Sequence, residues 1–155
     1  MSEYCLGDNQ SPINLDTGTA VTGTVSRDLI FAGYEQVNSV NTKLENNGHS
    51  VELEVTVVDL SVRSLAFSVQ LHSVPREAAM MSGGPLAKPY QLLQLHFHWG
   101  YIDRRGSEHT INNKRYPMEM HLVHLASDIE WGVGSATSPV NIPDGLAVAA
   151  FLWEV

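Results

Sequence analysis

The strongest constraint on the fold of this chain is an alternating run at residues 91–100, with the sequence QLLQLHFHWG. Its apolar residues are Leu93, Leu95, Phe97 and Trp99, and its polar residues between them are Gln94, His96 and His98. A period of two residues predicts a β-strand with one apolar face and one polar face. His96 and His98 then lie on the same face, one strand repeat apart, where two imidazoles can reach one point in space.

A second alternating run, from residue 116 to residue 125, places Glu119, His121 and Val123 on one face. A hairpin-like pairing of the two runs brings His121 opposite the first two histidines. Three neutral imidazoles without a thiolate form the ligand set of a catalytic zinc site that keeps one position open for water. Copper and cobalt are alternative metals for the same donors. The other interpretation is that these histidines are only polar residues on a strand face that borders solvent.

Two hydrogen-bond acceptors accompany the histidines. Gln94 lies one strand repeat before His96, and Glu119 lies one repeat before His121. A ligating imidazole usually donates its second N–H to an acceptor that holds the ring in place, so this arrangement favours the metal-binding interpretation. Water at the open position of such a zinc site has its pKa lowered to about 7, which makes hydroxide available at neutral pH.

The remaining patterns predict one mainly β domain. Strands are expected at residues 29–31, 43–45, 50–57, 65–72 and 146–153, with a turn at 46–48. Residues 75–89 are expected to form a loop that contains a single helical turn at 78–81. The run at 146–153 is continuously apolar, which is the pattern of a strand buried on both faces. No repeat or linker divides the chain.

Composition narrows the classes of function. The net charge is −8, which argues against general nucleic-acid binding because that function uses a basic face. No apolar run reaches the length of a membrane helix, and the start of the chain lacks the pattern of a signal peptide. The single cysteine, Cys5, is either a free thiol or half of a bridge whose partner lies elsewhere.

Three further polar residues are ambiguous from local pattern alone. His49 follows the turn at 46–48 and is by default a surface histidine. Glu108 and His109 form either a buried polar pair or an exposed loop edge.

Several motifs resemble those of α-class carbonic anhydrases. They are QSPIN at 10–14, NNGH at 46–49, LHFHWG at 95–100, GSEHT at 106–110, EMHLVH at 119–124 and DGLAV at 144–148. The resemblance runs in order from about residue 5 to the end of the chain. It implies that residues 1–155 are a single partial domain of that family, with a central twisted, mostly antiparallel sheet and few short helices.

The resemblance also implies a function and a role for each matching residue. The reaction would be the reversible hydration of carbon dioxide to bicarbonate by zinc-bound hydroxide. His96, His98 and His121 would bind Zn²⁺, with Gln94 and Glu119 as acceptors and His109 as a structural hydrogen-bonding residue beside them. His49 would shuttle protons, a task that an imidazole pKa near 6.5 suits. Glu108 would orient a threonine hydroxyl, and Val123 and Val148 would line the apolar pocket for carbon dioxide.

The family's domain extends further at its C-terminal end than this chain does. The threonine partner of Glu108, the rest of the pocket and the acceptor for His98 would lie in the missing part. Cys5 would be one half of a disulfide found in secreted or extracellular members. Without later strands, 146–153 would leave an unpaired apolar edge, which predicts self-association. A non-catalytic binding or matrix module is the alternative function, and zinc-dependent esterase activity is a third.

Overall fold

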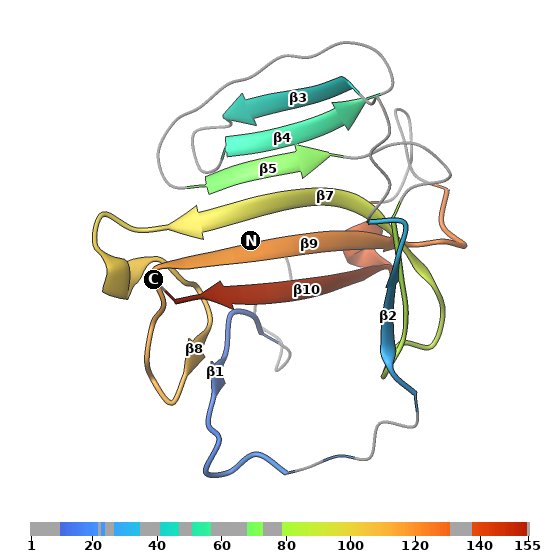
Figure 1. Ribbon diagram of the computed structural model, residues 1–155. Coiled ribbons are helices and arrows are strands. Elements are labelled where there is room, and N and C mark those ends of the chain that lie inside the picture. Colours follow the sequence, from blue (N-terminus) through green and yellow to red (C-terminus); the bar gives the residue numbers. More distant parts are fainter. Residues whose placement is uncertain are drawn as a thin grey trace.

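The computed structural model describes residues 10–21, 23, 27–34, 41–46, 51–56, 68–72, 79–130 and 138–154. For 41–46, 51–56 and 68–72, only the backbone is described. His49 and Cys5, to which the family resemblance assigned a proton shuttle and half of a bridge, lie outside the described residues. The described chain is mainly β, as predicted, and its strands form a curled sheet (Figure 1).

The centre of the sheet is a long strand, β7 (Tyr90–Trp99), which is the run that contains His96 and His98. β9 (Met118–Ala126) pairs with it in antiparallel fashion, and β10 (Leu146–Trp153) pairs with the far side of β9. On the other side of β7 lie β5 (Ser68–His72) and the hairpin of β3 (Asn41–Asn46) and β4 (Val51–Thr56). The two predicted alternating runs are therefore direct neighbours in the sheet.

Shorter elements complete the architecture. β2 (Leu29–Ala32) pairs with β6 (Met80–Gly83), which in turn pairs with the start of β7. β1 (Asn14–Leu15) and β8 (Thr110–Ile111) form a small parallel pair. Two single-turn 3₁₀ helices are η2 (Asp103–Arg105) and η3 (Pro139–Asn141). The pairing of β1 with β8 holds the N-terminal segment against the loop between β7 and β9.

A β-bulge in β7 sets the register of the site. Leu92 lies opposite His124, whereas Gln94 lies opposite Val123, so two residues of β7 span one step of β9. Beyond this bulge, His96 lies directly opposite His121. Residues directly opposite in an antiparallel pair share a face, so Gln94, His96 and His98 join the odd-numbered residues of β9 on one face.

The predicted helical turn at 78–81 was wrong, as was the assignment of all of 75–89 to a loop. Residues 80–83 form β6, in which Met80 and Met81 lie opposite Gln91 and Tyr90 on one side, while β2 pairs along the other. Met81 is only 3% exposed. An Ala-Met run favours a helix by only about 0.5 kcal/mol per residue. Backbone pairing on both edges of the strand and burial of the Met81 side chain outweigh that preference.

The apolar run at 146–153 predicted a strand buried on both faces, which is wrong for this chain, whereas the unpaired apolar edge expected without later strands is present in the described part of the chain. β10 has the predicted bounds, but it is the last strand in the sheet order and pairs only with β9 in the described part of the chain. Val148, Phe151 and Trp153 are 53%, 39% and 46% exposed. Apolar composition alone cannot distinguish a strand with two neighbours from one that forms an edge, because burial depends on what packs against it.

Candidate metal centre

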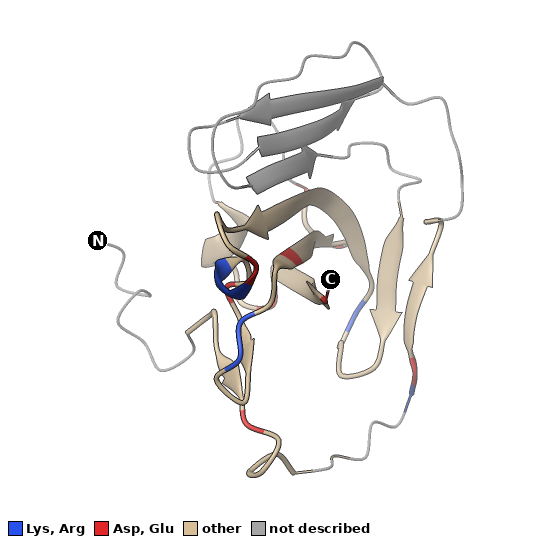
Figure 2. Ribbon diagram, turned by 60° about the vertical axis from the view of Figure 1, so that its left-hand side comes forward, with Lys and Arg blue, Asp and Glu red and all other residues tan. Residues whose placement is uncertain are grey.

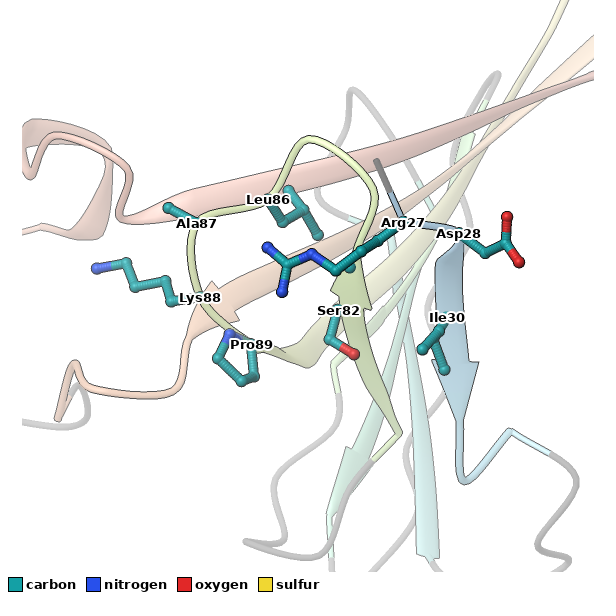
Figure 3. A pocket seen from close by; sticks show the side chains of 9 residues that line it. Arg27, Asp28, Ile30, Ser82, Leu86, Ala87, Lys88 and Pro89 are labelled. Atoms are coloured by element: carbon teal, nitrogen blue, oxygen red, sulfur yellow. The ribbon is translucent and has the colours of Figure 1, made fainter. Parts of the chain in front are cut away.

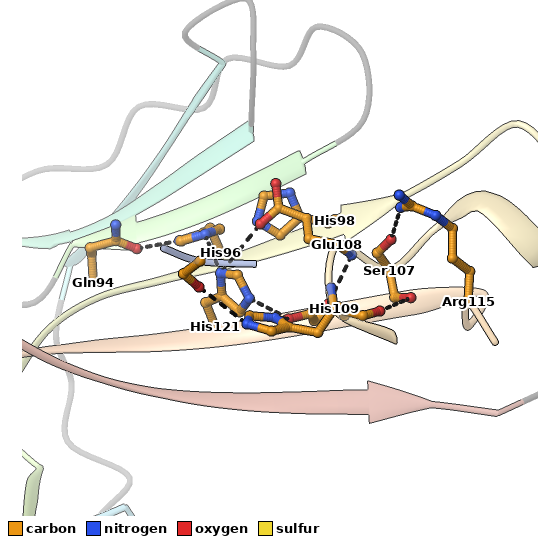
Figure 4. Close-up of polar contacts among 10 residues, drawn as sticks. Gln94, His96, His98, Ser107, Glu108, His109, Arg115 and His121 are labelled. Carbon is orange, nitrogen blue, oxygen red and sulfur yellow. Dashed lines mark hydrogen bonds and ion pairs between the residues drawn. The ribbon is translucent and has the colours of Figure 1, made fainter. Parts of the chain in front are cut away.

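Three histidines converge on one face of the sheet. His96 and His98 project from β7, and His121 projects from the opposite position on β9 (Figure 4). The centroids of the three rings lie 4.8 Å from one another in each pair. One nitrogen from each ring lies within 4.8 Å of the others, so the cluster could hold a metal ion. The strand period thus produces the grouping that it predicts.

Two acceptors determine which ring nitrogens of His96 and His121 carry protons. The Nδ1–H of His96 donates to the Oε1 of Gln94 at 2.7 Å. The Nε2–H of His121 donates to the Oε1 of Glu119 at 2.6 Å. An amide oxygen and a carboxylate can only accept, so each of these histidine nitrogens must be the donor. In the neutral rings, the nitrogens that face each other, His96 Nε2 and His121 Nδ1, therefore both present lone pairs.

The two facing ring nitrogens show whether a cation fits between His96 and His121. His96 Nε2 and His121 Nδ1 lie 3.0 Å apart. Two lone pairs at that distance repel each other unless a proton or a metal ion lies between the rings and accepts both. The Nε2 of His98 is also buried and makes no hydrogen bond among the described residues, although the Oε2 of Glu108 lies 3.3 Å from it. Three imidazole nitrogens that converge on one point are the donor set that zinc prefers, at about 2.0–2.1 Å per bond.

Glu108 lies at the exposed side of the histidine cluster. Its Oε2 is 3.3 Å from the Nε2 of His98 and 4.0 Å from the Nδ1 of His121, and its side chain is 41% exposed. Burial lowers the pKa of His98, while the Glu108 carboxylate acts in the opposite direction. The neutral form of His98, which is the form that binds metals, is therefore favoured by its surroundings.

Glu119 is a fully buried carboxylate, 0% exposed, that accepts hydrogen bonds on both oxygens. The backbone N–H groups of Glu108 and His109 donate to its Oε2 at 2.8 Å each. The rings of His109 and His121 donate to its Oε1. Burial alone would raise the pKa of Glu119, but the hydrogen bonds from His121 and His109 lower it to about 2. The ionised carboxylate thus joins β9 to the loop that carries Glu108.

The N-terminal motif contacts this network through His109. The hydroxyl of Ser11 lies 3.2 Å from the Nε2 of His109, whose Nδ1 donates to Glu119. Thr110 binds the same segment: its N–H donates to the carbonyl of Ile13 at 3.2 Å, and its hydroxyl donates to the side chain of Asn14 at 2.8 Å. The pattern that was ambiguous at Glu108 and His109 resolves into a loop edge at Glu108 and a mostly buried polar contact at His109.

Val123 and Val148 lie on the same side of the sheet as the histidines. They are opposite one another in the pairing of β9 with β10. Val123 is 9% exposed and Val148 is 53% exposed. The two valines thus form an apolar strip beside the cluster that remains open to solvent along β10.

A polar pair on the opposite face of the sheet lies apart from this network. His124 is 0% exposed, and the hydroxyl of Tyr34 contacts its Nε2. Burial lowers the pKa of His124 and raises the pKa of Tyr34 to about 12. The pair joins β9 to the segment after β2, on the face where Phe31 packs 6.3 Å from Phe151.

Sequence reasoning missed two features of the site. Ser11 was recognised only as part of a motif, because nothing in its local sequence says that it reaches His109, 98 residues away. The bulge at Leu93 was also missed, although it sets the register. A long alternating run gives no signal for one extra residue, since bulges depend on the partner strand.

Comparison with known proteins identifies a family that covers the whole chain. Residues 1–155 match the family model of eukaryotic-type carbonic anhydrases. Mouse carbonic anhydrase 7 is 38% identical over 148 residues, which cover 96% of this chain and 47% of that protein. Human carbonic anhydrase 7 is 37% identical over the same length and coverage. Mouse carbonic anhydrase 15 is 35% identical over 153 residues, which cover 98% of this chain and 41% of that protein.

Fold and site define a mainly β protein whose curled antiparallel sheet carries a three-histidine cluster that could hold a metal ion. The chain belongs to the eukaryotic-type carbonic anhydrase family, whose members are metalloenzymes. It spans about half the length of the curated relatives that it matches. Within the described residues, no helix is both long and apolar enough to cross a membrane.

Proposed function

We propose that this chain carries the zinc centre of a carbonic anhydrase that reversibly hydrates carbon dioxide to bicarbonate. The observation that carries the proposal is the 3.0 Å approach of His96 Nε2 and His121 Nδ1, both left as lone pairs by the acceptors behind them. Zinc held by these histidines would supply a Lewis-acid centre that lowers the pKa of bound water to about 7. Every other contribution comes from side chains of the protein.

In this proposal, the acceptors behind the ligands hold the rings in place. Gln94 fixes His96, and Glu119 fixes His121, each through a hydrogen bond shorter than 2.8 Å. Such partners typically change metal affinity 10–100-fold, or by about 1.4–2.7 kcal/mol. His109 supports Glu119 and is itself contacted by Ser11. The ligand geometry therefore depends on contacts from the N-terminal segment as well as from β7, β9 and the loop between them.

Groups at the open side of the cluster would act on the substrates. We assign Glu108 to orienting a threonine hydroxyl by accepting a hydrogen bond from it, because this carboxylate borders the ligands and remains accessible. Val123 and Val148 would supply the apolar wall against which carbon dioxide binds and from which water is excluded. His49 would carry protons between the site and solvent, an assignment that rests on the motif resemblance alone.

The wider properties of the protein are proposals of the same kind. Residues 1–155 would form one partial carbonic anhydrase domain that acts on small molecules, carbon dioxide and bicarbonate. An extracellular location would follow if Cys5 forms the disulfide typical of secreted members. Self-association would follow from the exposed apolar edge of β10, where Val148, Phe151 and Trp153 face solvent.

The first test is zinc binding to the purified chain. Dialysis against zinc followed by metal analysis should give one ion per chain, and His121→Ala should abolish this stoichiometric binding. Asp128→Asn is the matched control, since Asp128 pairs with Lys88 outside the cluster. Zinc binding that His121→Ala leaves unchanged would refute the ligand assignment.

The second test is carbon dioxide hydration by the zinc-loaded chain, measured by stopped flow against the same concentration of aqueous zinc. A rate well above that of aqueous zinc supports the enzyme. The alternative, a non-catalytic zinc-binding module, is favoured by the 53% exposure of Val148, which leaves the apolar strip open. Stoichiometric zinc with a rate equal to that of aqueous zinc would establish that alternative for this chain.

A further inference from the structure

Three arginine side chains from two separate segments line one hollow on the surface. Arg104 and Arg105 belong to η2, and Arg115 lies between β8 and β9. The hollow has a volume of about 450 Å³. Figure 2 shows basic residues on η2 and on the loop after β8, on the same side of the molecule. We propose that this hollow, the arginine pocket, binds the phosphate group of a small molecule.

Neutral groups hold two of these arginines in position. An Nη1–H of Arg105 donates to the hydroxyl of Tyr101 at 3.0 Å, and the guanidinium carbon lies 5.8 Å from the centre of the Tyr101 ring. An Nη1–H of Arg115 donates to the backbone carbonyl of Ser107 at 2.5 Å. A hydroxyl, a ring face and a carbonyl orient a guanidinium without cancelling its charge. The positive charges are therefore placed but not neutralised.

The charge balance around the pocket differs from that of the whole chain. In the part of the chain that the structure describes, none of the three arginines forms a salt bridge, even though Asp103 precedes them on η2. The nearby Lys114 is different, because it pairs with Glu154. The three arginines make up a third of the nine lysines and arginines of the chain, whose net charge is −8. A local concentration of uncompensated cations attracts anions.

The number of donors favours phosphate among small anions. Each guanidinium offers five N–H donors in a planar fork, and the two anchors above use one donor each. A carboxylate has two oxygens and one charge, whereas a phosphate group has three or more acceptor oxygens and up to two charges. Arginine binds such groups bidentately. A hollow of about 450 Å³ accommodates a bare phosphate ion or a phosphate with a small organic group attached.

A second hollow offers a matched comparison. It is lined by residues of β2, of β6 with the loop after it, and of the segment just before β2, including Arg27, Asp28 and Lys88 (Figure 3). There a carboxylate shares the wall, and the ammonium group of Lys88 lies 3.0 Å from Asp128. One of the two cations of this hollow, Lys88, is therefore paired with a carboxylate. Arg27 therefore serves as a control arginine that lines a hollow of a different charge balance.

The test is a titration of the metal-free chain with inorganic phosphate and, separately, with phenyl phosphate, in the presence of EDTA. Binding is followed by NMR through the Nε–Hε signals of the arginines. Saturable shifts are expected for Arg104, Arg105 and Arg115 but not for Arg27. Arg104→Gln and Arg115→Gln should each weaken binding about tenfold, whereas Arg27→Gln should change it less than about twofold.

Further measurements distinguish phosphate binding at the arginine pocket from the alternatives. His121→Ala should retain phosphate binding, so the arginine pocket can be established even if the proposed metal centre fails. Tighter binding of phenyl phosphate than of inorganic phosphate identifies an organic phosphate as the ligand, and equal binding identifies the free ion. Absence of saturation below about 10 mM phosphate, an affinity weaker than about 3 kcal/mol, overturns the proposal. Equal weakening by Arg27→Gln and Arg115→Gln, with all variants folded by circular dichroism, overturns it as well.

Discussion

Replacement of Glu119 by glutamine tests the buried network that supports the candidate metal centre. The two oxygens of Glu119 accept from four N–H groups, two on each oxygen. A glutamine side chain keeps one oxygen and presents an NH₂ group in place of the other, so two buried donors lose their acceptor in either orientation of the amide. Each unsatisfied buried donor costs about 1–3 kcal/mol, which predicts a loss of about 2–6 kcal/mol in the free energy of unfolding.

The same substitution should weaken zinc binding about 10–100-fold, because in either orientation of the amide the Nε2–H of His121 loses the carboxylate that orients the ring and meets an NH₂ group or a neutral oxygen instead. Stability is measured by urea unfolding of the metal-free chain at pH 7, and zinc affinity by competition with a chelator. Glu154→Gln is the control, since it removes a carboxylate that pairs with Lys114 on the surface. A variant that loses less than about 1 kcal/mol, or that binds zinc as the unsubstituted chain does, would refute the role assigned to these hydrogen bonds.

Three further predictions concern parts of the fold around the site. Burial lowers the pKa of His124, so its contribution to stability is fully present above about pH 6.5 and declines as the pH falls. His124→Asn should therefore flatten the decrease in urea stability between pH 8 and pH 5, and parallel pH curves would contradict this. A Cβ on Gly106 would lie 1.6 Å from the carbonyl oxygen of Pro117, so Gly106→Ala should cost about 1–3 kcal/mol in thermal or urea unfolding. Gly23→Ala, which meets nothing within 4 Å, should leave stability nearly unchanged. Val148→Lys on the exposed edge of β10 should shift the chain toward monomer in sedimentation velocity, and a chain that is monomeric without the substitution would contradict the proposed self-association.

The sequence predicted those parts of the fold in which the residues of a single strand show a characteristic pattern. The alternation around His96 and His98 predicts a strand and a shared face, and the structure has both in β7. The bounds of β10 were also predicted, from its apolar run. Its apolar run by itself predicted burial on both faces, and the exposed edge was expected only from the absence of later strands, because the exposure of Val148 depends on which strands pair with β10 rather than on its own residues.

Features that depend on distant segments could not be predicted. β6 forms because β2 and β7 pair with its two edges, whereas its own Ala-Met composition favours a helix. Glu119 was expected to be an acceptor for His121, and it is in hydrogen-bond contact with that ring. Its other three donors come from Glu108 and His109, on a loop whose path no local pattern specifies.

The bulge in β7 shows that an alternating pattern is necessary for this site but not sufficient to form it. With the pairing of Leu92 and His124 continued without interruption, His96 would lie opposite Met120. His121 would then project from the other face of the sheet, because successive residues of a strand alternate between faces. The extra residue, Leu93, shifts the register by one and places His121 opposite His96. Two runs with the correct period can therefore assemble three ligands only when their relative register is also set, and that register is a property of the paired strands.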